Sequence, residues 1–213
     1  MIVFIVHTGP KHLIYRLKWV RTTMGKIVAI SCSPRNDGSS IQISDAFLDG
    51  AMGLSTNIVT LHRPTKFKSM QDCTRCMACK GTGRCKIDDD LTVVLDDIAE
   101  ADCVVFSTPL YFNGPTATYK IIEDRMYSFL DKDRKSVLKP GKKAVLIISS
   151  CYPESDLKKA ADILTSNLEL IGFEMLGVIT YCDQRRKMPA GDNPELIHEA
   201  KELGAKMRNT PTV

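Results

Sequence analysis

The chain has the size and composition of one globular domain. It has 213 residues, of which 44% are hydrophobic and 25% are charged, and a chain of this length buries about 70% of the surface that its unfolded form exposes. No apolar run reaches the ~18 residues of a membrane-spanning helix, so the sequence predicts no membrane association. The net charge of +4 arises in residues 1–23, which hold four of the 29 basic residues and no acid, while the other 25 match the 25 acidic residues. This balance gives no indication of nucleic-acid binding.

The first 23 residues differ from the rest of the chain. Their apolar patch is shorter than the core of a secretory signal, and their basic residues follow this patch instead of preceding it. We therefore expect a cytoplasmic protein. Met24 opens the run MGKIVAI, which is typical of a first strand, and we expect it to be the natural start. In this interpretation residues 1–23 are an N-terminal extension, and residues 24–213 form the folded domain.

Short runs rich in Val and Ile alternate with helical patterns after Met24. The runs lack a clean alternation of apolar and polar residues, as expected for strands buried on both faces. This order predicts a doubly wound α/β fold, with a five-stranded parallel sheet covered by helices. Asp89 or Asp90 is expected to cap the second helix, and Asn193 the fifth. The expected strands are 26–30, 57–61, 103–107, 143–148 and 175–181, and the expected helices are 39–52, 91–100, 116–130, 154–171 and 193–207.

The loop after the first strand has the composition of a phosphate site. It runs from Ser31 to Ser40, is rich in serine, contains Arg35 and leads directly into a helix. The helix N-terminus offers free backbone N–H groups, the hydroxyls can donate to phosphate oxygens, and Arg35 can bind two oxygens at once. Because the sequence lacks the G-x-G-x-x-G and G-x4-G-K-[ST] motifs, we expect a mononucleotide. A serine-rich loop that only forms a turn and a helix cap is the alternative.

Four cysteines lie within thirteen residues, in the pattern C-x2-C-x2-C-x5-C. Thiolates this close in sequence can surround one metal centre, and two tight C-x2-C steps are typical of iron–sulfur ligation. The surrounding segment, residues 62–90, is interpreted as an insertion between the second strand and its helix. One self-contained 4Fe-4S cluster uses all four cysteines, whereas structural zinc sites usually place two pairs far apart. Zinc, and disulfides or unmodified thiols, are the alternatives. The four cysteines are Cys73, Cys76, Cys79 and Cys85.

An aromatic loop follows the third strand. Pro109 stiffens the strand exit, and Gly114 permits close approach of the backbone. Tyr111 and Phe112 offer flat faces to a heteroaromatic ring. This loop, the serine-rich loop and the loop at 149–153 all follow strands, so we expect them to meet at the carboxyl edge of the sheet, where such folds bind ligands. Packing at the protein surface is the alternative for an aromatic loop.

Together these motifs resemble the iron–sulfur flavoproteins, a branch of the NADPH-dependent FMN reductase superfamily with a flavodoxin-like fold. The resemblance covers about residues 24–208 and implies FMN, a 4Fe-4S cluster on the four cysteines, and a homodimer or homotetramer. It rests on Ser33-Pro34-Arg35 with Gly38-Ser39-Ser40, on the cysteine run followed by Asp88-Asp89, and on Thr108-Pro109-Leu110-Tyr111-Phe112 with Lys120 and Asp124-Arg125. The residues that it implies for FMN are Ser33, Arg35, Ser39 and Ser40 at the phosphate, and Pro109, Leu110, Tyr111, Phe112, Asn113 and Gly114 along the isoalloxazine ring.

We therefore predict an electron-transfer flavoprotein that couples FMN to a 4Fe-4S cluster, with a ferredoxin-like carrier as its partner. No side chain is expected to act as a catalytic acid or base. The basic residues Lys80, Arg84 and Lys86 either tune the cluster and guide an acidic carrier, or are ordinary solvated charges. Two other functions are compatible with the residues. One is an NAD(P)H-dependent reductase of flavins or quinones, and the other is a binding module whose cysteines hold zinc.

The remaining cysteines have separate expectations. Cys103 and Cys182 lie on expected strands and are predicted to be inert core thiols. Cys32 lies in the serine-rich loop, at a position where the resembling proteins often have glycine. The role of Cys151 depends on whether the loop at 149–153 faces the flavin.

Overall fold

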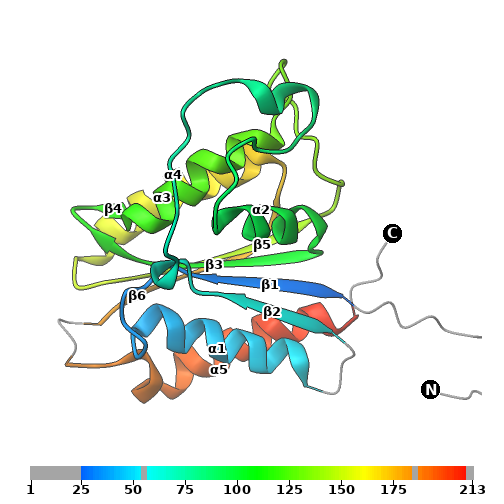
Figure 1. The fold of residues 1–213 in the computed structure, drawn as a ribbon. Helices are drawn as coiled ribbons and strands as arrows, with labels where there is room; N and C mark the ends of the chain where they lie inside the picture. The colour runs from blue at the N-terminus through cyan, green and yellow to red at the C-terminus, as the bar shows by residue number, and fades with distance from the viewer. Residues whose placement is uncertain (1–24, 54–56, 184–186, 210–213) are drawn as a thin grey trace, which may run out of the picture.

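The computed structural model describes residues 25–53, 57–183 and 187–209, so the expected extension 1–23 and the expected start at Met24 lie outside the described residues. Figure 1 shows an α/β sandwich with helices on both faces of a central sheet. No helix among the described residues is long and apolar enough to cross a membrane. The strands are β1 (Lys26–Ser31), β2 (Ile58–His62), β3 (Cys103–Tyr111), β4 (Gly114–Pro115), β5 (Lys143–Ser150) and β6 (Glu174–Cys182), and the helices are α1 (Ser39–Met52), α2 (Leu91–Glu100), α3 (Ala117–Arg125), α4 (Glu154–Ile171) and α5 (Pro194–Ala205).

The central sheet is parallel and has the order β2-β1-β3-β5-β6, with the short β4 paired antiparallel to β3. The chain passes from β1 outward to β2, then returns to place β3 on the other side of β1, with Ile27 opposite Cys103. The carboxyl ends of β1 and β3 therefore flank the point where the strand order reverses, which is the usual place of a ligand in such sheets. The predicted doubly wound, flavodoxin-like sheet of five parallel strands is confirmed.

Two hydrophobic cores cover the two faces of the sheet. Alternate residues of β1 point to opposite faces, so Val28 packs in the core beneath α2, α3 and α4, while Ile27 packs in the core beneath α1 and α5. The neighbouring strand β3 repeats this division with Phe106 and Val105. Burial on both faces explains why the strand sequences are almost continuously apolar.

The third strand is longer than predicted. It was expected to end at residue 107, but its pairing with β5 continues to Pro109, which lies opposite Ser149. The pairing with β1 stops at Ser107, so a residue without an N–H group breaks no hydrogen bond on that side. Phe112 and Asn113 then take left-handed backbone conformations, with φ of 52° and 62°, and turn the chain into β4. The aromatic segment is therefore a hairpin and not an irregular loop.

The structure also differs from the prediction in the second half of the helix expected at 116–130. Helix α3 ends at Arg125 and continues as a 3₁₀ turn, η3 (Met126–Phe129). The Lys80 ammonium donates to the carbonyl oxygens of Tyr127 and Leu130. These carbonyls therefore bind a side chain from another segment, which favours the end of regular α-helix here.

The predicted helix caps are confirmed in part. The side chain of Asn193 accepts a hydrogen bond from the Leu196 N–H at 3.1 Å and caps α5. At the start of α2, Asp89 accepts from the Leu91 N–H, whereas the carboxylate of Asp90 accepts from the backbone of Lys68 and Ser69 instead.

Helices α1 and α5 approach each other closely through glycine. A Cβ atom placed on Gly204 would lie 2.0 Å from the carbonyl oxygen of Phe47, and one placed on Gly50 would lie 2.1 Å from that of Lys201. Both contacts are to helix backbone, which cannot move aside independently of the helix. This pair of glycines therefore sets the distance between the two helices on this face of the sheet.

We expect Gly204→Ala to lower the free energy of unfolding by about 1–3 kcal/mol, because the added methyl group must push the helices apart. Chemical denaturation measured by circular dichroism checks this. Gly81→Ala is the matched control, because a Cβ at Gly81 meets no atom within 4 Å. Equal denaturation midpoints for Gly204→Ala and Gly81→Ala would contradict the close contact between α1 and α5.

Candidate functional site

The cysteine segment connects β2 to α2 and rises beyond the helical layer formed by α2, α3 and α4 (Figure 1). The four cysteines predicted as ligands line one small cavity of about 20 Å³. Among the described residues, no three His, Cys, Asp or Glu side chains converge closely enough to hold a single metal ion. The four thiols thus share a cavity but do not converge on one point. The predicted ligands that share this cavity are Cys73, Cys76, Cys79 and Cys85.

The backbone around the cysteines turns sharply. Arg75 and Met77 have left-handed conformations, with φ of 54° and 61°, on either side of Cys76. A 3₁₀ turn, η2 (Ala78–Gly81), follows, and the carbonyl oxygen of Cys79 accepts hydrogen bonds from the N–H groups of Thr82 and Gly83. These reversals let side chains three residues apart face the same cavity, which an extended segment cannot do.

The thiols of the segment lie in different electrostatic environments. A hydrogen bond from the backbone of Ala78 lowers the pKa of the exposed Cys76 thiol, and the charge of Lys86 acts in the same direction. Burial raises the pKa of Cys79, and the nearby charges of Cys85 and Cys73 raise it further. The three thiols are therefore close enough to interact electrically, and their simultaneous ionisation requires a compensating positive charge.

The cysteines outside the segment fall into two groups. Burial raises the pKa of Cys103 to about 12 and raises that of Cys32 as well, so both stay protonated in the core. The prediction for Cys103 is confirmed. Cys182 is only half-buried at the end of β6, and Cys151 is exposed.

A buried arginine holds the two ends of the cysteine segment together. The Arg125 guanidinium donates to the carbonyl oxygens of Gln71 at 2.9 Å and Ile87 at 3.0 Å, which precede and follow the four cysteines. It also donates to both carboxylate oxygens of Asp89, at 3.0 and 3.3 Å, and the side chains of this ion pair are fully buried. Asp89 in turn accepts a hydrogen bond from the Gln71 N–H at 2.8 Å. Arg125 on α3 therefore closes the base of the loop.

The basic residues near the cysteines have defined contacts. The Lys80 ammonium donates to the Tyr127 and Leu130 carbonyl oxygens, both at 2.7 Å, and lies 3.3 Å from the centre of the Tyr127 ring. Arg84 forms an ion pair with Asp96 on α2. Lys80 thus attaches the loop to the protein, whereas Arg84 and Lys86 are both exposed.

Two buried polar groups, on residues that line the cysteine cavity, have no hydrogen-bond acceptor among the described residues. They are the Arg125 Nε–H and the Ser128 hydroxyl, and both residues line the cavity together with the four cysteines. Arg125 is 1% exposed and Ser128 is 2% exposed. Buried donors are nearly always satisfied in folded proteins. The cavity therefore combines four thiols with two unused donors, and this set suits an anionic iron–sulfur centre.

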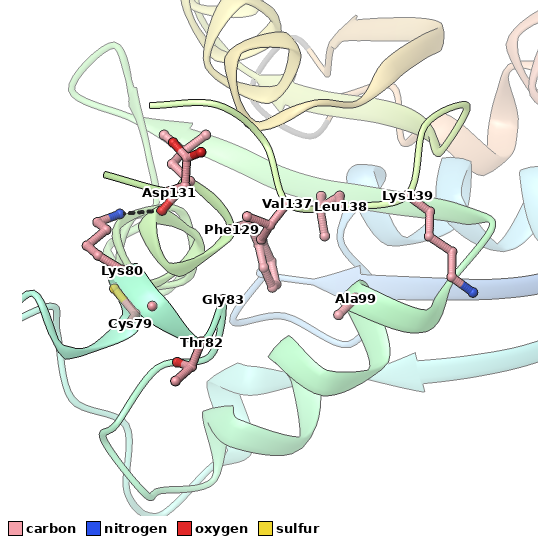
Figure 2. Close-up of a pocket in the computed structure, with 12 residues that line it drawn as sticks. Cys79, Lys80, Thr82, Gly83, Ala99, Phe129, Asp131, Val137, Leu138 and Lys139 are labelled. Atoms are coloured by element: carbon pink, nitrogen blue, oxygen red, sulfur yellow. Dashed lines mark hydrogen bonds between the residues drawn. The ribbon is translucent and has the colours of Figure 1, made fainter. Parts of the chain in front are cut away.

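A larger cavity of about 520 Å³ also borders Cys79 (Figure 2). It lies between the turn at 79–83 and the end of η3 with the chain that follows it, where Phe129 and Val137 line the cavity. A Cβ on Gly83, whose φ is +68°, would lie 3.0 Å from the Val137 side chain, so the two walls touch at this point. This cavity was not predicted, because its walls are 50 residues apart along the chain at the Lys80–Leu130 contact.

The serine-rich loop forms a second polar site at the N-terminus of α1. Ser33, Ser39 and Ser40 are buried there, and the Ser40 hydroxyl has no hydrogen-bond partner among the described residues. Arg35 forms an ion pair with Asp37 at 2.9 Å and lines a cavity of about 190 Å³ beside Ser39. The N-cap residue is Gly38, which has no side chain to cap the helix. Free N–H groups, hydroxyls and an arginine together suit a phosphate.

Hydrogen bonds join the aromatic hairpin to the serine-rich loop. The Thr116 hydroxyl donates to the carbonyl oxygen of Cys32 at 3.1 Å, and the Thr116 N–H donates to the Thr108 hydroxyl at 3.2 Å. The predicted meeting of these loops at the carboxyl edge is therefore confirmed. The predicted ring-binding residues around this hairpin differ in exposure: Leu110 is buried, Tyr111 is 51% exposed and Phe112 is 97% exposed.

The third predicted wall lies beside this hairpin. Ser149 pairs with Pro109 across the sheet, which brings the loop that follows β5 to the same edge. The Ser150 hydroxyl accepts a hydrogen bond from the Tyr152 N–H at 3.0 Å and shapes the turn that carries Cys151. Whether Cys151 contacts a flavin stays a prediction.

The strand order and the helices on both faces of the sheet place the protein in the flavodoxin-like fold class. A family model described as NADPH-dependent FMN reductase matches residues 25–184, and the chain belongs to this family. An iron–sulfur flavoprotein of Methanocaldococcus jannaschii is 32% identical over 102 residues, covering 47% of this chain and 51% of that protein. One from Archaeoglobus fulgidus is 30% identical over 104 residues, covering 49% and 46%. These relatives support the assignment of the chain to the iron–sulfur flavoprotein branch of this family. The chain spans about half the length of each of the two relatives.

Solved structures agree on the fold. An NAD(P)H:quinone oxidoreductase from Methanothermobacter marburgensis superposes with a TM-score of 0.63 at 14% identity, covering 89% of this chain and 100% of that one. An FMN-dependent NADH-azoreductase from Bacillus anthracis, solved in complex with FMN, gives a TM-score of 0.60 at 17% identity, covering 87% and 100%. At such low identity these structures support the architecture alone.

We expect Asp89→Asn to lower the free energy of unfolding by about 3 kcal/mol or more, because it leaves the buried Arg125 charge without its partner. Thermal or chemical denaturation checks this. The control is Asp96→Asn, which removes the exposed partner of Arg84 and should leave stability almost unchanged. Similar stability of the two variants would show that the buried pair does not hold the loop.

Proposed function

We propose that the protein is an electron-transfer flavoprotein in which FMN is coupled to a 4Fe-4S cluster. The observation that carries the proposal is that all four cysteines of the C-x2-C-x2-C-x5-C run line one cavity that also holds two unused buried donors. In this proposal the segment 62–90 is the cluster-binding insertion of the domain. The proposed ligands of the cluster are Cys73, Cys76, Cys79 and Cys85.

The proposed FMN site lies at the carboxyl edge of the sheet, where the serine-rich loop and the aromatic hairpin meet. Ser33, Ser39 and Ser40 donate hydrogen bonds to the phosphate at the N-terminus of α1, and Arg35 leaves Asp37 to bind the same phosphate. The serines are supported by their burial and by the unpartnered Ser40 hydroxyl. The residues proposed to lie along the isoalloxazine ring are Pro109, Leu110, Tyr111, Phe112, Asn113 and Gly114.

In this proposal the protein's own residues position FMN and the 4Fe-4S cluster and exclude water from both. Bound here, FMN would exchange two electrons and the cluster would exchange one at a time, so the pair would convert between the two kinds of transfer. The exposed Tyr111 and Phe112 support a homodimer or homotetramer in which a second copy covers the flavin site. The proposed partner of the cluster is a ferredoxin-like carrier, and the exposed Lys86 supplies positive charge beside Cys76.

An NAD(P)H-dependent reductase of flavins or quinones is the second candidate. It is supported by the family, which is described as NADPH-dependent FMN reductase. Anaerobic mixing of the oxidised protein with NADPH separates the two candidates. Rapid bleaching of the flavin absorption favours the reductase, whereas slow bleaching combined with rapid reduction by reduced ferredoxin favours the carrier.

The proposal is tested by purifying the protein without oxygen and measuring iron, zinc and flavin per chain together with the visible spectrum. About four irons and one FMN per chain are expected. One zinc per chain, or no metal, would overturn the cluster and leave the reductase as the better candidate. A colourless protein with zinc would instead support a binding module.

Replacement of Cys76 by Ala is expected to abolish the broad visible absorption of the cluster and to leave the absorption of FMN, because Cys76 lines the cavity of the four cysteines and not the cavity beside Arg35 and Ser39. Iron and flavin analysis of the purified variant checks this. Cys182→Ala is the control and should keep both groups. Full iron content in Cys76→Ala would exclude Cys76 as a ligand.

Arg35→Ala should weaken FMN binding by about 1.5–3 kcal/mol, the scale of a hydrogen bond to a charged group. Titration of the flavin-free protein with FMN, followed by fluorescence quenching, measures the change. Arg84→Ala, which removes an exposed arginine paired with Asp96 outside this site, should bind FMN with unchanged affinity. If both variants bound equally tightly, Arg35 would have no part in the phosphate site.

A further inference from the structure

The cysteine cavity contains more than four thiols. Among the side chains of residues 25–53, 57–183 and 187–209, four buried polar atoms lack a hydrogen-bond partner: Ser40 Oγ, Tyr119 Oη, Arg125 Nε and Ser128 Oγ. Two of these four, on Arg125 and Ser128, belong to residues that line the cavity of the four cysteines. Both residues are at least 98% buried, so bulk water does not satisfy their donors.

The protein uses the other side-chain donors of Arg125 fully. Both terminal nitrogens of Arg125 bind the base of the loop, through Gln71, Ile87 and Asp89. Only the Nε–H is left, and it belongs to the part of the side chain nearest α3. Ser128 follows three residues later, in η3. The two donors therefore come from one short stretch of chain on one side of the cavity.

Ser128 is placed beside one particular cysteine. It lines the cavity of the four thiols and also an adjoining cavity of about 180 Å³, and Cys85 is the cysteine that borders both. Leu95 and Phe129 line the adjoining cavity, and both are apolar. The adjoining cavity is also lined by Arg84 and Asp96, which form an ion pair with each other, and the Ser128 hydroxyl bonds to neither of them.

We propose that the Ser128 hydroxyl and the Arg125 Nε–H donate hydrogen bonds to the sulfurs of the cluster held by the four cysteines, and that these bonds raise its reduction potential. The inference rests on the proposed function. Reduction adds negative charge to the cluster, so a hydrogen-bond donor stabilises the reduced form more than the oxidised form. The fixed positive charge of Arg125 acts in the same direction, although Asp89 offsets part of it.

Arg125 has two roles in this proposal. It fixes the loop through its terminal nitrogens and faces the cluster through Nε, so a change at Arg125 would disturb both. Ser128 provides the cleaner test, because its hydroxyl has no other partner. Removing that hydroxyl should leave the protein's existing hydrogen bonds intact.

The test is redox titration of Ser128→Ala, followed by electron paramagnetic resonance for the cluster and by absorption for the flavin. At a fixed potential we expect the ratio of reduced to oxidised cluster to fall by up to about tenfold, which corresponds to a midpoint about 59 mV lower for one electron. The flavin midpoint in the same molecules should not move. The matched control is Ser44→Ala, a buried serine of α1 on the other face of the sheet, which should leave both midpoints unchanged.

An unchanged cluster midpoint in a variant that keeps its iron would overturn the proposal. If Ser128→Ala lost its iron, the isosteric pair Ser128→Thr and Ser128→Val decides instead, because the two differ only in the hydroxyl. Better iron retention and a higher midpoint in the Thr variant would support the hydrogen bond, and equal behaviour would overturn it. Wild-type protein without iron would disprove the proposed function itself, an outcome that the iron assay distinguishes from a failure of Ser128 alone.

Discussion

The buried ion pair between Arg125 and Asp89 is the interaction on which the cysteine segment depends. Removing two charges from water is costly, and here the cost is offset by hydrogen bonds from Arg125 to Gln71, Ile87 and both oxygens of Asp89. The contacts join the residues just before and just after the four cysteines. A long irregular loop with little apolar surface thereby becomes a closed ring on α3. Without this anchor, the thiols would have no fixed wall against which to gather.

The sheet provides a second, independent constraint. Its strand order reverses at β1 and β3, and the loops that follow these strands are joined by the Thr116 hydrogen bond to Cys32. The proposed flavin site is therefore built on strand ends, whereas the proposed cluster site is built on a loop held by the contacts of Arg125 and Lys80. The flavin site and the cluster site are therefore held in place by different contacts. For this reason we expect substitution of a ligand cysteine to affect the cluster and substitution in the phosphate loop to affect FMN binding.

Much of the architecture was predictable because it depends on local pattern. Runs such as KIVAI and KAVLII are apolar on both faces, and this is sufficient to predict buried parallel strands. The hairpin at Tyr111 was not predicted, because Thr108-Pro109 is typical of a loop, and only the pairing with β5 extends the strand. Arg125 belonged to the family resemblance, but its role was not predictable, since an arginine in a polar helix is normally exposed and its partner Asp89 lies 36 residues away.

The sequence alone determined the fold class, the cysteine pattern and the serine-rich loop, because each is a property of neighbouring residues. The tertiary structure decided which distant groups meet. It buried Arg125 against Asp89, attached Lys80 to the carbonyls after α3, and brought Ser128 to the cavity of the four cysteines. These pairings join segments more than 35 residues apart, and burial gives them their significance, since the same charges and hydroxyls in water would be satisfied by solvent.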